Sequence, residues 1–205
     1  MIKILIPLKA MHEAIETVKE IGSTFTATQT LDAGIHPRTL YQMRDEGVII
    51  QLARGLYCLP ENVPVNFDIT VVTKKYPKAV ICLISALSYH DLTTQIPHAV
   101  SIALPKGTTS PKLKYPPITV HRFSNDAYTE GIETHTIDNT PVKIYCIEKT
   151  IADCFKYRNK IGIDIALEAI KLYKTRKDFN ITNLMKYAKI CRVERIMKPY
   201  MEMSV

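Results

Sequence analysis

The fold of the first part of the chain is decided by residues 27–59, which read ATQTLDAGIHPRTLYQMRDEGVIIQLARGLYCL. This stretch holds two short segments of helical pattern, each followed by a glycine, and then two apolar runs at 48–52 and 56–59. Glycine ends helices because it adopts the left-handed conformation of a C-terminal cap without steric strain. Apolar runs joined by a short turn, here Arg54-Gly55, are typical of a β-hairpin. The stretch therefore predicts helix, turn, helix and hairpin in that order.

The first helix of this pair is short. Thr26 or Thr28 can cap its start, because a threonine hydroxyl accepts a hydrogen bond from an unpaired amide of the first turn. The helix then runs over residues 27–33 and ends at Gly34. Its Leu31 is expected to face inward.

The second helix begins at Pro37, which suits a first turn because its missing N–H is one that the helix leaves unpaired anyway. We expect this helix to run over residues 37–46 and to end at Gly47. Leu40 and Met43 are three residues apart, so they share one face and are expected to point into a core.

A longer helix is expected upstream, over residues 8–21, followed by Gly22. Apolar residues recur along one face of it at Met11, Ile15, Val18 and Ile21. Three helices followed by a hairpin is the order of a winged helix-turn-helix. Because Pro60 and Pro64 indicate a linker, we expect this domain to cover residues 1–62.

The rest of the chain, residues 63–205, has the pattern of a mixed α/β domain with a small antiparallel sheet and C-terminal helices, so that the whole chain is α+β. Helices are expected at 67–76, 80–89, 148–157, 163–173, 181–188 and 193–200. Strands are expected at 99–104, 118–123, 132–137 and 142–147, the last two joined by the polar turn Asp138-Asn139.

The charge of the chain is uneven along its length. The formal net charge is +7, yet residues 1–60 and 61–153 each carry as many acids as Lys and Arg, and residues 154–205 carry twelve Lys and Arg against five acids. A basic surface attracts polyanions, although lysines on helices can also simply solvate an outer face. The candidate basic surface consists of Lys171, Lys174, Arg176, Lys177, Lys186 and Lys189.

The five cysteines are odd in number, scattered and without a C-x-x-C pair, so we expect buried, reduced thiols. The apolar stretch from Ile4 to Leu8 is broken by Pro7 and is too short for a membrane span or a signal peptide. A cytoplasmic protein without a membrane partner is expected.

The helix at 37–46 has the pattern of a recognition helix, because its polar residues lie opposite its apolar face. Arg38, Thr39 and Gln42 can enter a major groove together, where arginine suits guanine and glutamine suits adenine. Phosphate or flanking contacts are expected from the neighbouring side chains and from Arg54 at the hairpin tip. The candidate DNA-contacting residues are Thr28, His36, Arg38, Thr39, Tyr41, Gln42, Arg44 and Arg54. The neutral net charge of residues 1–60 leaves open a domain that contacts only proteins.

The sequence gives little indication of a catalytic site. Glu148 and Asp153 are five apart on a helix and so point in different directions, and neither has an obvious His or acid partner. We expect Asp153 to be a buried helix contact rather than a catalyst. The histidines and cysteines lack metal-ligand spacing, so no catalytic residue, metal or cofactor is expected.

At several of these positions the sequence resembles the AbiEi-type antitoxins of type IV toxin-antitoxin, or abortive-infection, phage-defence systems. The segments that carry the resemblance are 28–35, 38–41, 46–47 and 53–57 near the start, and 79–87, 131–133, 141–142 and 148–155 downstream. The Ala-Arg-Gly-Leu-Tyr hairpin at 53–57 and the Lys-Thr-Ile-Ala-Asp-Cys helix at 149–154 are fairly specific together.

The resemblance implies a two-domain repressor that binds operator DNA at inverted repeats in its own promoter, as a dimer or as cooperatively bound monomers. It also implies an antitoxin domain that opposes a nucleotidyltransferase toxin without forming a stable complex with it. Arg38, Thr39, Gln42 and Arg54 carry over as DNA contacts. The competing hypothesis is a nucleic-acid-binding or RNA-acting protein, with or without enzymatic activity, that the basic C-terminal domain drives.

Overall fold

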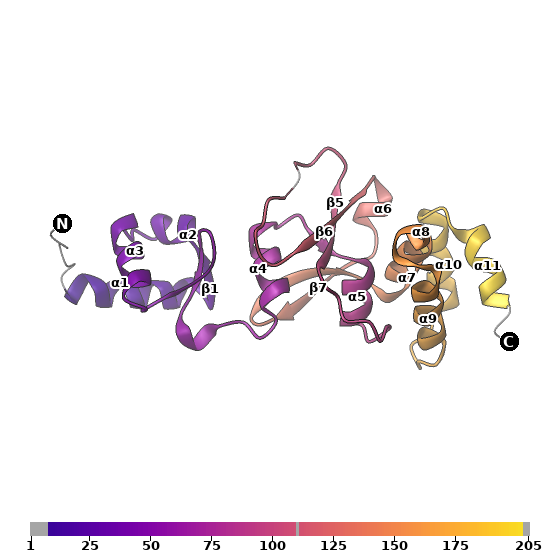
Figure 1. The fold of residues 1–205 in the computed structure, drawn as a ribbon, viewed down its shortest axis with the longest axis horizontal. Coiled ribbons are helices and arrows are strands. Elements are labelled where there is room, and N and C mark those ends of the chain that lie inside the picture. Colours follow the sequence, from indigo (N-terminus) through magenta and orange to yellow (C-terminus); the bar gives the residue numbers. More distant parts are fainter. Residues whose placement is uncertain (1–7, 110, 203–205) are drawn as a thin grey trace. The chain divides into compact units, whose positions relative to one another are not determined.

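The computed structural model describes residues 8–109 and 111–202, which form two compact units (Figure 1). The first unit comprises the chain up to Lys75 together with Thr136–Thr140, and the second comprises Tyr76–His135 and the chain from Pro141 onward. The division follows Lys75, whereas the sequence places it near residue 62, because helix α4 (Phe67–Lys75) packs with the first unit. Residues 4–7 of the apolar stretch noted above lie outside the described residues.

The first unit has the expected three helices and hairpin, with one further strand. Its elements are α1 (Leu8–Ile21), β1 (Thr24–Thr26), α2 (Ala27–Asp32), α3 (Pro37–Asp45), β2 (Ile50–Ala53), β3 (Leu56–Cys58), the 3-10 helix η1 (Pro60–Asn62) and α4. Strand β3 is central in an antiparallel sheet of order β1-β3-β2. Strand β1 has only three residues, which is too short for a period-two pattern to be recognised in the sequence.

The core of the first unit gathers apolar residues from α1, α3 and the sheet. Its most buried members are Val18, Phe25, Met43 and Ile49. The expected inward position of Leu31 is wrong, since this residue is 46% exposed and Thr30 is buried instead. Thr26 begins α2 with a reciprocal capping box, and successive residues of a helix then point about 100° apart, which directs Thr30 to the core.

The second unit contains a five-stranded sheet and most of the helices (Figure 1). Its strands are β4 (Val80–Ile81), β5 (Val100–Pro105), β6 (Ile118–Phe123), β7 (Ile132–Ile137) and β8 (Thr140–Tyr145). Its helices are α5 (Leu83–Tyr89), α6 (Asp126–Thr129), α7 (Ile147–Lys156), α8 (Arg158–Ile161), α9 (Ile163–Lys174), α10 (Ile181–Ile190) and α11 (Glu194–Glu202). The α+β class is therefore confirmed.

The expected antiparallel arrangement of this second sheet is wrong, because the sheet is mixed, in the order β6-β5-β4-β8-β7. Strand β4 is antiparallel to β5 and parallel to β8, and β5 is parallel to β6. The sequence predicts one helix over 80–89, but the first two residues of this segment form β4 between β5 and β8. A short apolar run suits a buried strand as well as a buried helix, so its pattern cannot separate them.

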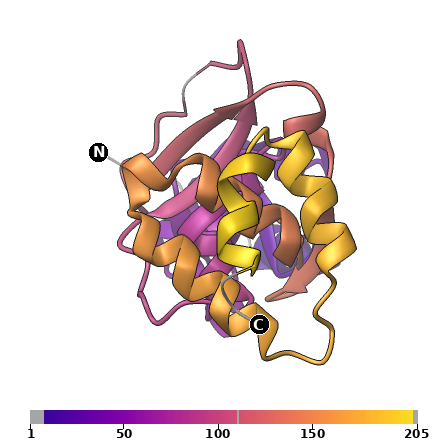
Figure 2. The same ribbon diagram turned by 90° about the vertical axis from the view of Figure 1, so that its right-hand side faces the viewer.

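Helix α7 lies against α5, α9, α10 and α11 in the helical part of the second unit (Figure 2). It carries two fully buried charges, and Lys149 Nζ donates to Asp153 Oδ2 at 2.5 Å. The ammonium also lies 4.2 Å from the ring centre of Tyr145, and Cys191 Sγ donates to Asp153 Oδ1 at 3.2 Å. Asp153 is thus a buried helix contact, as expected.

All five cysteines are free and buried, as the sequence indicates. Burial raises the pKa of the Cys58 and Cys146 thiols to about 11, and it raises the pKa of the other three as well. Among the described residues, no helix is long and apolar enough to cross a bilayer.

Replacing Lys149 by Met should destabilise the protein by about 3–5 kcal/mol, because Asp153 would be left as an uncompensated buried charge. Urea denaturation followed by circular dichroism measures this difference in unfolding free energy. The double variant Lys149→Met/Asp153→Leu is the control, and it should recover most of the loss because it removes both charges. A single variant as stable as the parent chain would contradict this account of the pair.

The protein should lose stability as the pH falls from 6.5 toward 4. Burial lowers the pKa of His121 from 6.5 to about 4, with Lys160 contributing. The unfolded chain therefore takes up this proton before the folded chain does, so that about 3 kcal/mol is lost across the window. The melting temperature of His121→Gln should depend less on pH, whereas the exposed control His98→Gln should behave like the parent chain. Equal pH dependence in all three proteins would refute the assignment.

Candidate nucleic-acid interface

Helix α3 is fixed at its start and along its inner face. His36 caps it, with Nδ1 accepting the backbone N–H of Arg38 at 3.2 Å, and Pro37 occupies the first turn. Leu40 and Met43 are 2% and 0% exposed, so this face is held in the core as expected. The sequence assigned His36 to phosphate contact, and the structure shows that one of its ring nitrogens caps the helix.

The outer face of α3 carries the polar residues proposed to read bases. Arg38 is exposed, and Thr39 and Gln42 are half-buried. Gln42 Nε2 donates to Glu46 Oε1 at 2.7 Å, which orients the amide. Arg38 and Gln42 are one helical turn apart, and the structure places both away from the Leu40 and Met43 side.

The C-terminal end of α3 differs from its start in charge. Arg44 donates from Nε and Nη2 to Asp45 Oδ1, at 2.9 and 2.7 Å, and its Cζ lies 5.2 Å from the centre of the Tyr41 ring. The hydrogen bond to Asp45 raises the pKa of Arg44. Asp45 and Glu46 at this end would repel a polyanion. The first turn suits a polyanion better, because its amide groups favour negative charge.

The β2–β3 hairpin is held beside the start of α2. Gly55 has φ +70°, and its carbonyl accepts the Ala27 N–H at 3.0 Å. Arg54 at the tip is exposed, as is Thr28 in the first turn of α2. The structure therefore brings the tip of the hairpin close to the first turn of α2.

Lys75 is a further cation at this tip, which reasoning from sequence missed. Its Nζ donates to the backbone carbonyl of Arg54. Burial, and then the nearby Arg54 guanidinium, lower the pKa of Lys75. The residue lies at the end of α4, beyond the expected domain boundary. The only signal for it in the sequence is its position beside Lys74 in the basic last turn of this helix.

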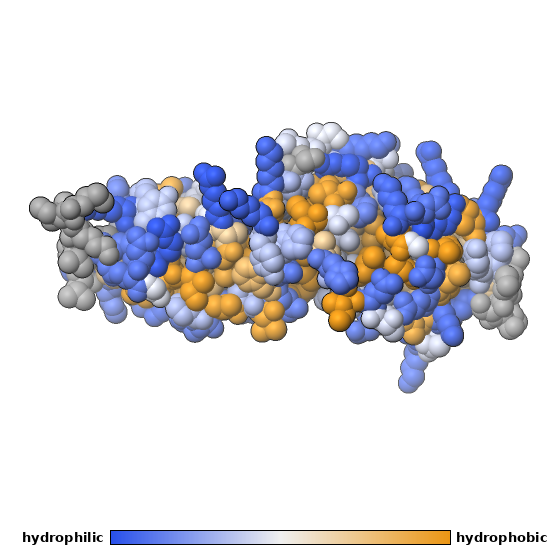
Figure 3. All heavy atoms as spheres, in the orientation of Figure 1, coloured by the Kyte–Doolittle hydropathy of each residue, from blue (hydrophilic) through white to orange (hydrophobic). Residues whose placement is uncertain are grey.

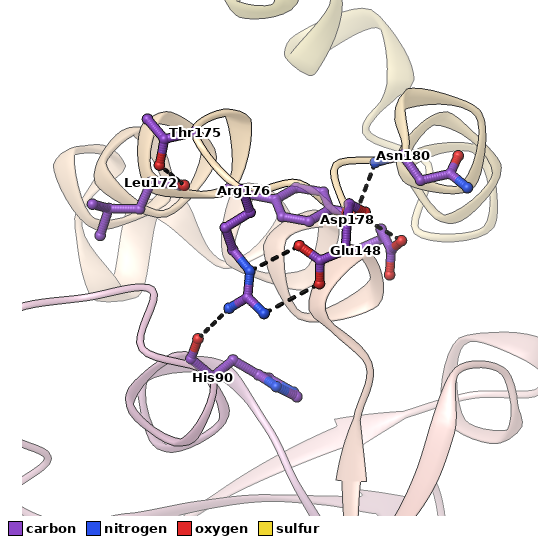
Figure 4. A network of polar contacts seen from close by, with 8 residues as sticks. His90, Glu148, Leu172, Thr175, Arg176, Asp178 and Asn180 are labelled. Atoms are coloured by element: carbon purple, nitrogen blue, oxygen red, sulfur yellow. Dashed lines mark hydrogen bonds and ion pairs between the residues drawn. The ribbon is translucent and has the colours of Figure 1, made fainter.

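The basic residues proposed in the second unit differ in their contacts. Lys174 Nζ donates to the carbonyl of Met201 at 3.2 Å, near the end of α11. Arg176 donates to both carboxylate oxygens of Asp178 at 3.0 and 3.1 Å, and to the carbonyl of His90 at 3.0 Å (Figure 4). These two cations therefore hold the unit together.

The other four residues of that set are exposed. Lys186 and Lys189 lie 3.7 Å from Glu130 and Glu194, whereas Lys171 and Lys177 make no ion pair within the described ranges. Hydrophilic side chains extend from the helical part of the molecule in the space-filling view (Figure 3). In residues 8–109 and 111–202, no group of three or more His, Cys, Asp or Glu is arranged to hold a metal ion.

Replacing Lys75 by Met should loosen the hairpin tip without unfolding the protein. The Arg54 carbonyl would lose its charged donor, which is worth about 1.5 kcal/mol, so amide hydrogen exchange at residues 54–56 should accelerate about tenfold. Mass spectrometry of peptides from this segment measures the rate. Lys78→Met removes an equal charge from the second unit and should leave that rate unchanged. The assigned contact is wrong if the two variants exchange alike.

Two comparisons with known proteins gave a match, one over a short segment and the other over nearly the whole chain. A family model described as "Transcriptional regulator, AbiEi antitoxin" matches residues 13–60, which confirms the resemblance over that segment. The crystal structure of the RV2827C protein from Mycobacterium tuberculosis is similar over 95% of this chain and 72% of that chain, with a TM-score of 0.58 and 13% sequence identity. At that identity the likeness shows the fold alone. No curated protein matches the chain.

Proposed function

We propose that the chain is a DNA-binding transcriptional regulator whose first unit is a winged helix-turn-helix, with α3 as recognition helix and the β2–β3 hairpin as wing. The observation that carries this proposal is the two-sided character of α3. Leu40 and Met43 fix one side in the core, while Arg38 and its polar neighbours face outward. The match of residues 13–60 to an AbiEi regulator model supports the same function.

Base reading is assigned to the first turns of α3. Arg38 is suited to donate to guanine and Gln42 to pair with adenine, and the Glu46 contact fixes the Gln42 amide before DNA arrives. Arg54 and Lys75 would contact phosphates beside the wing and supply affinity without sequence preference. Bound at a promoter, the protein would repress by excluding RNA polymerase.

The biological setting follows from the resemblance to AbiEi antitoxins. We propose a cytoplasmic autorepressor that binds inverted repeats, for which two copies of the first unit are required. The second unit would counter a nucleotidyltransferase toxin without a stable complex. No catalytic residue, metal or cofactor is assigned to this role.

The alternative function is binding of RNA or other nucleic acid through the second unit, favoured by the surplus of basic residues after residue 153 and by the exposure of Lys171 and Lys177. Such binding would depend steeply on salt and little on sequence.

An electrophoretic mobility shift with duplex from upstream of the gene separates the two functions. The full chain should prefer that duplex to random competitor, and Arg38→Ala/Gln42→Ala should lose about a hundredfold of that preference, because two base contacts are removed. The control Lys171→Ala/Lys177→Ala should keep it, at both low and high salt. Binding that ignores sequence and falls only with the lysine variant would instead establish the alternative.

A further inference from the structure

A cavity of about 440 Å³ opens in the second unit, and none of its lining residues is among those assigned to DNA. It lies where the loop between β6 and α6 meets the junction of α7 with α8 and the turn between α10 and α11. Cavities of roughly 300–1,000 Å³ are the size in which proteins bind small molecules. All of its lining residues belong to the same compact unit.

Three cations from two segments of the chain line this cavity. Lys156 ends α7, Arg158 begins α8, and Arg192 lies in the turn after α10. Among the described lining residues Asp126 is the one acid, so they carry a net positive charge. Arg158 Nη1 donates to the carbonyl of Phe155 at 2.9 Å, which fixes its guanidinium beside the cavity. Guanidinium and ammonium groups that line one cavity suit the oxygens of a phosphate.

The remaining wall of the cavity is neutral and partly apolar. Ser124 and Asn125 add a hydroxyl and an amide, both of which hydrogen-bond phosphates and sugars. Apolar side chains complete the lining, from Ala127, Ile190, Cys191, Val193 and Ile196. An apolar wall next to cations fits a ligand that has a ring at one end and an anion at the other.

The backbone at two of these residues is in an uncommon conformation. Asn125 has φ 46° and ψ −133°, and Arg192 has φ 60°. Glycine is the usual residue in the left-handed position after a helix, because a side chain is strained there. At residue 192 that position instead holds an arginine that lines the cavity. Strained residues of this kind gather at ligand sites.

We propose that this cavity binds a nucleotide-sized phosphate monoester, with Arg158, Arg192 and Lys156 around the phosphate and the apolar wall against the base. The site is independent of α3 and of the hairpin, so it stands whether or not the first unit reads DNA. It gives the second unit a small-molecule ligand of its own.

Isothermal titration calorimetry of the full chain with AMP, GMP, CMP and UMP tests the proposal. At least one should bind saturably with Kd below about 1 mM, and the matching nucleoside, which lacks the phosphate, should bind at least about tenfold more weakly. Arg158→Gln and Arg192→Gly should each weaken binding about tenfold. The double variant Lys171→Gln/Lys177→Gln removes two exposed charges elsewhere and should bind like the parent chain.

The Arg192→Gly variant should remain folded, because glycine adopts φ 60° freely. Its melting temperature should equal or exceed that of the parent chain. Weakened binding in this folded variant would therefore report a lost contact. The proposal is overturned if none of the four nucleotides saturates, if the nucleoside binds as tightly as its phosphate, or if the lysine control loses as much affinity as the arginine variants.

Discussion

The ion pair between Lys149 and Asp153 sets the arrangement of the second unit. Both charges are fully buried in α7, so each needs its partner in one geometry, and breaking that geometry would expose an unpaired charge to an apolar core. The aromatic ring of Tyr145 at the end of β8 lies against the ammonium, and Cys191 after α10 donates to the carboxylate. Strand end, central helix and the turn after α10 are thereby fixed around a single pair of charges, and this same turn carries the arginine of the proposed phosphate cavity.

In the first unit, the structure holds the polar outer face of α3 in a fixed position. A short helix is marginal alone, so α3 depends on its cap at His36 and on the burial of Leu40 and Met43. The hairpin is held by the Ala27 N–H and the Lys75 ammonium, which donate to the carbonyls of Gly55 and Arg54, and by the burial of all three residues of β3. Side chains such as Arg38 can then be presented from a fixed backbone, which would lower the entropy lost in the proposed binding to a DNA groove.

Sequence reasoning succeeded where local chemistry decides structure. Glycine and proline set the ends of α3, and the Asp138-Asn139 turn, both residues with positive φ, was placed between two strands. It failed where distant pairing decides, as for β4, which is a strand only because β5 and β8 flank it. The same distinction separates the parts of the candidate site that could be predicted from those that could not. The outward face of α3 follows from helical periodicity, whereas the approach of Lys75 to the hairpin tip depends on how the chain folds back.

The burial of all five thiols has a practical consequence for solution studies. Maleimide dyes react with exposed thiolates, and these sulfur atoms are both hidden and held protonated by their apolar surroundings. A cysteine introduced at an exposed position would therefore be labelled selectively in the folded protein, without first removing the native ones. The unaltered chain is thus a ready host for paired fluorophores, one on each unit, which would report the distance between them during ligand binding.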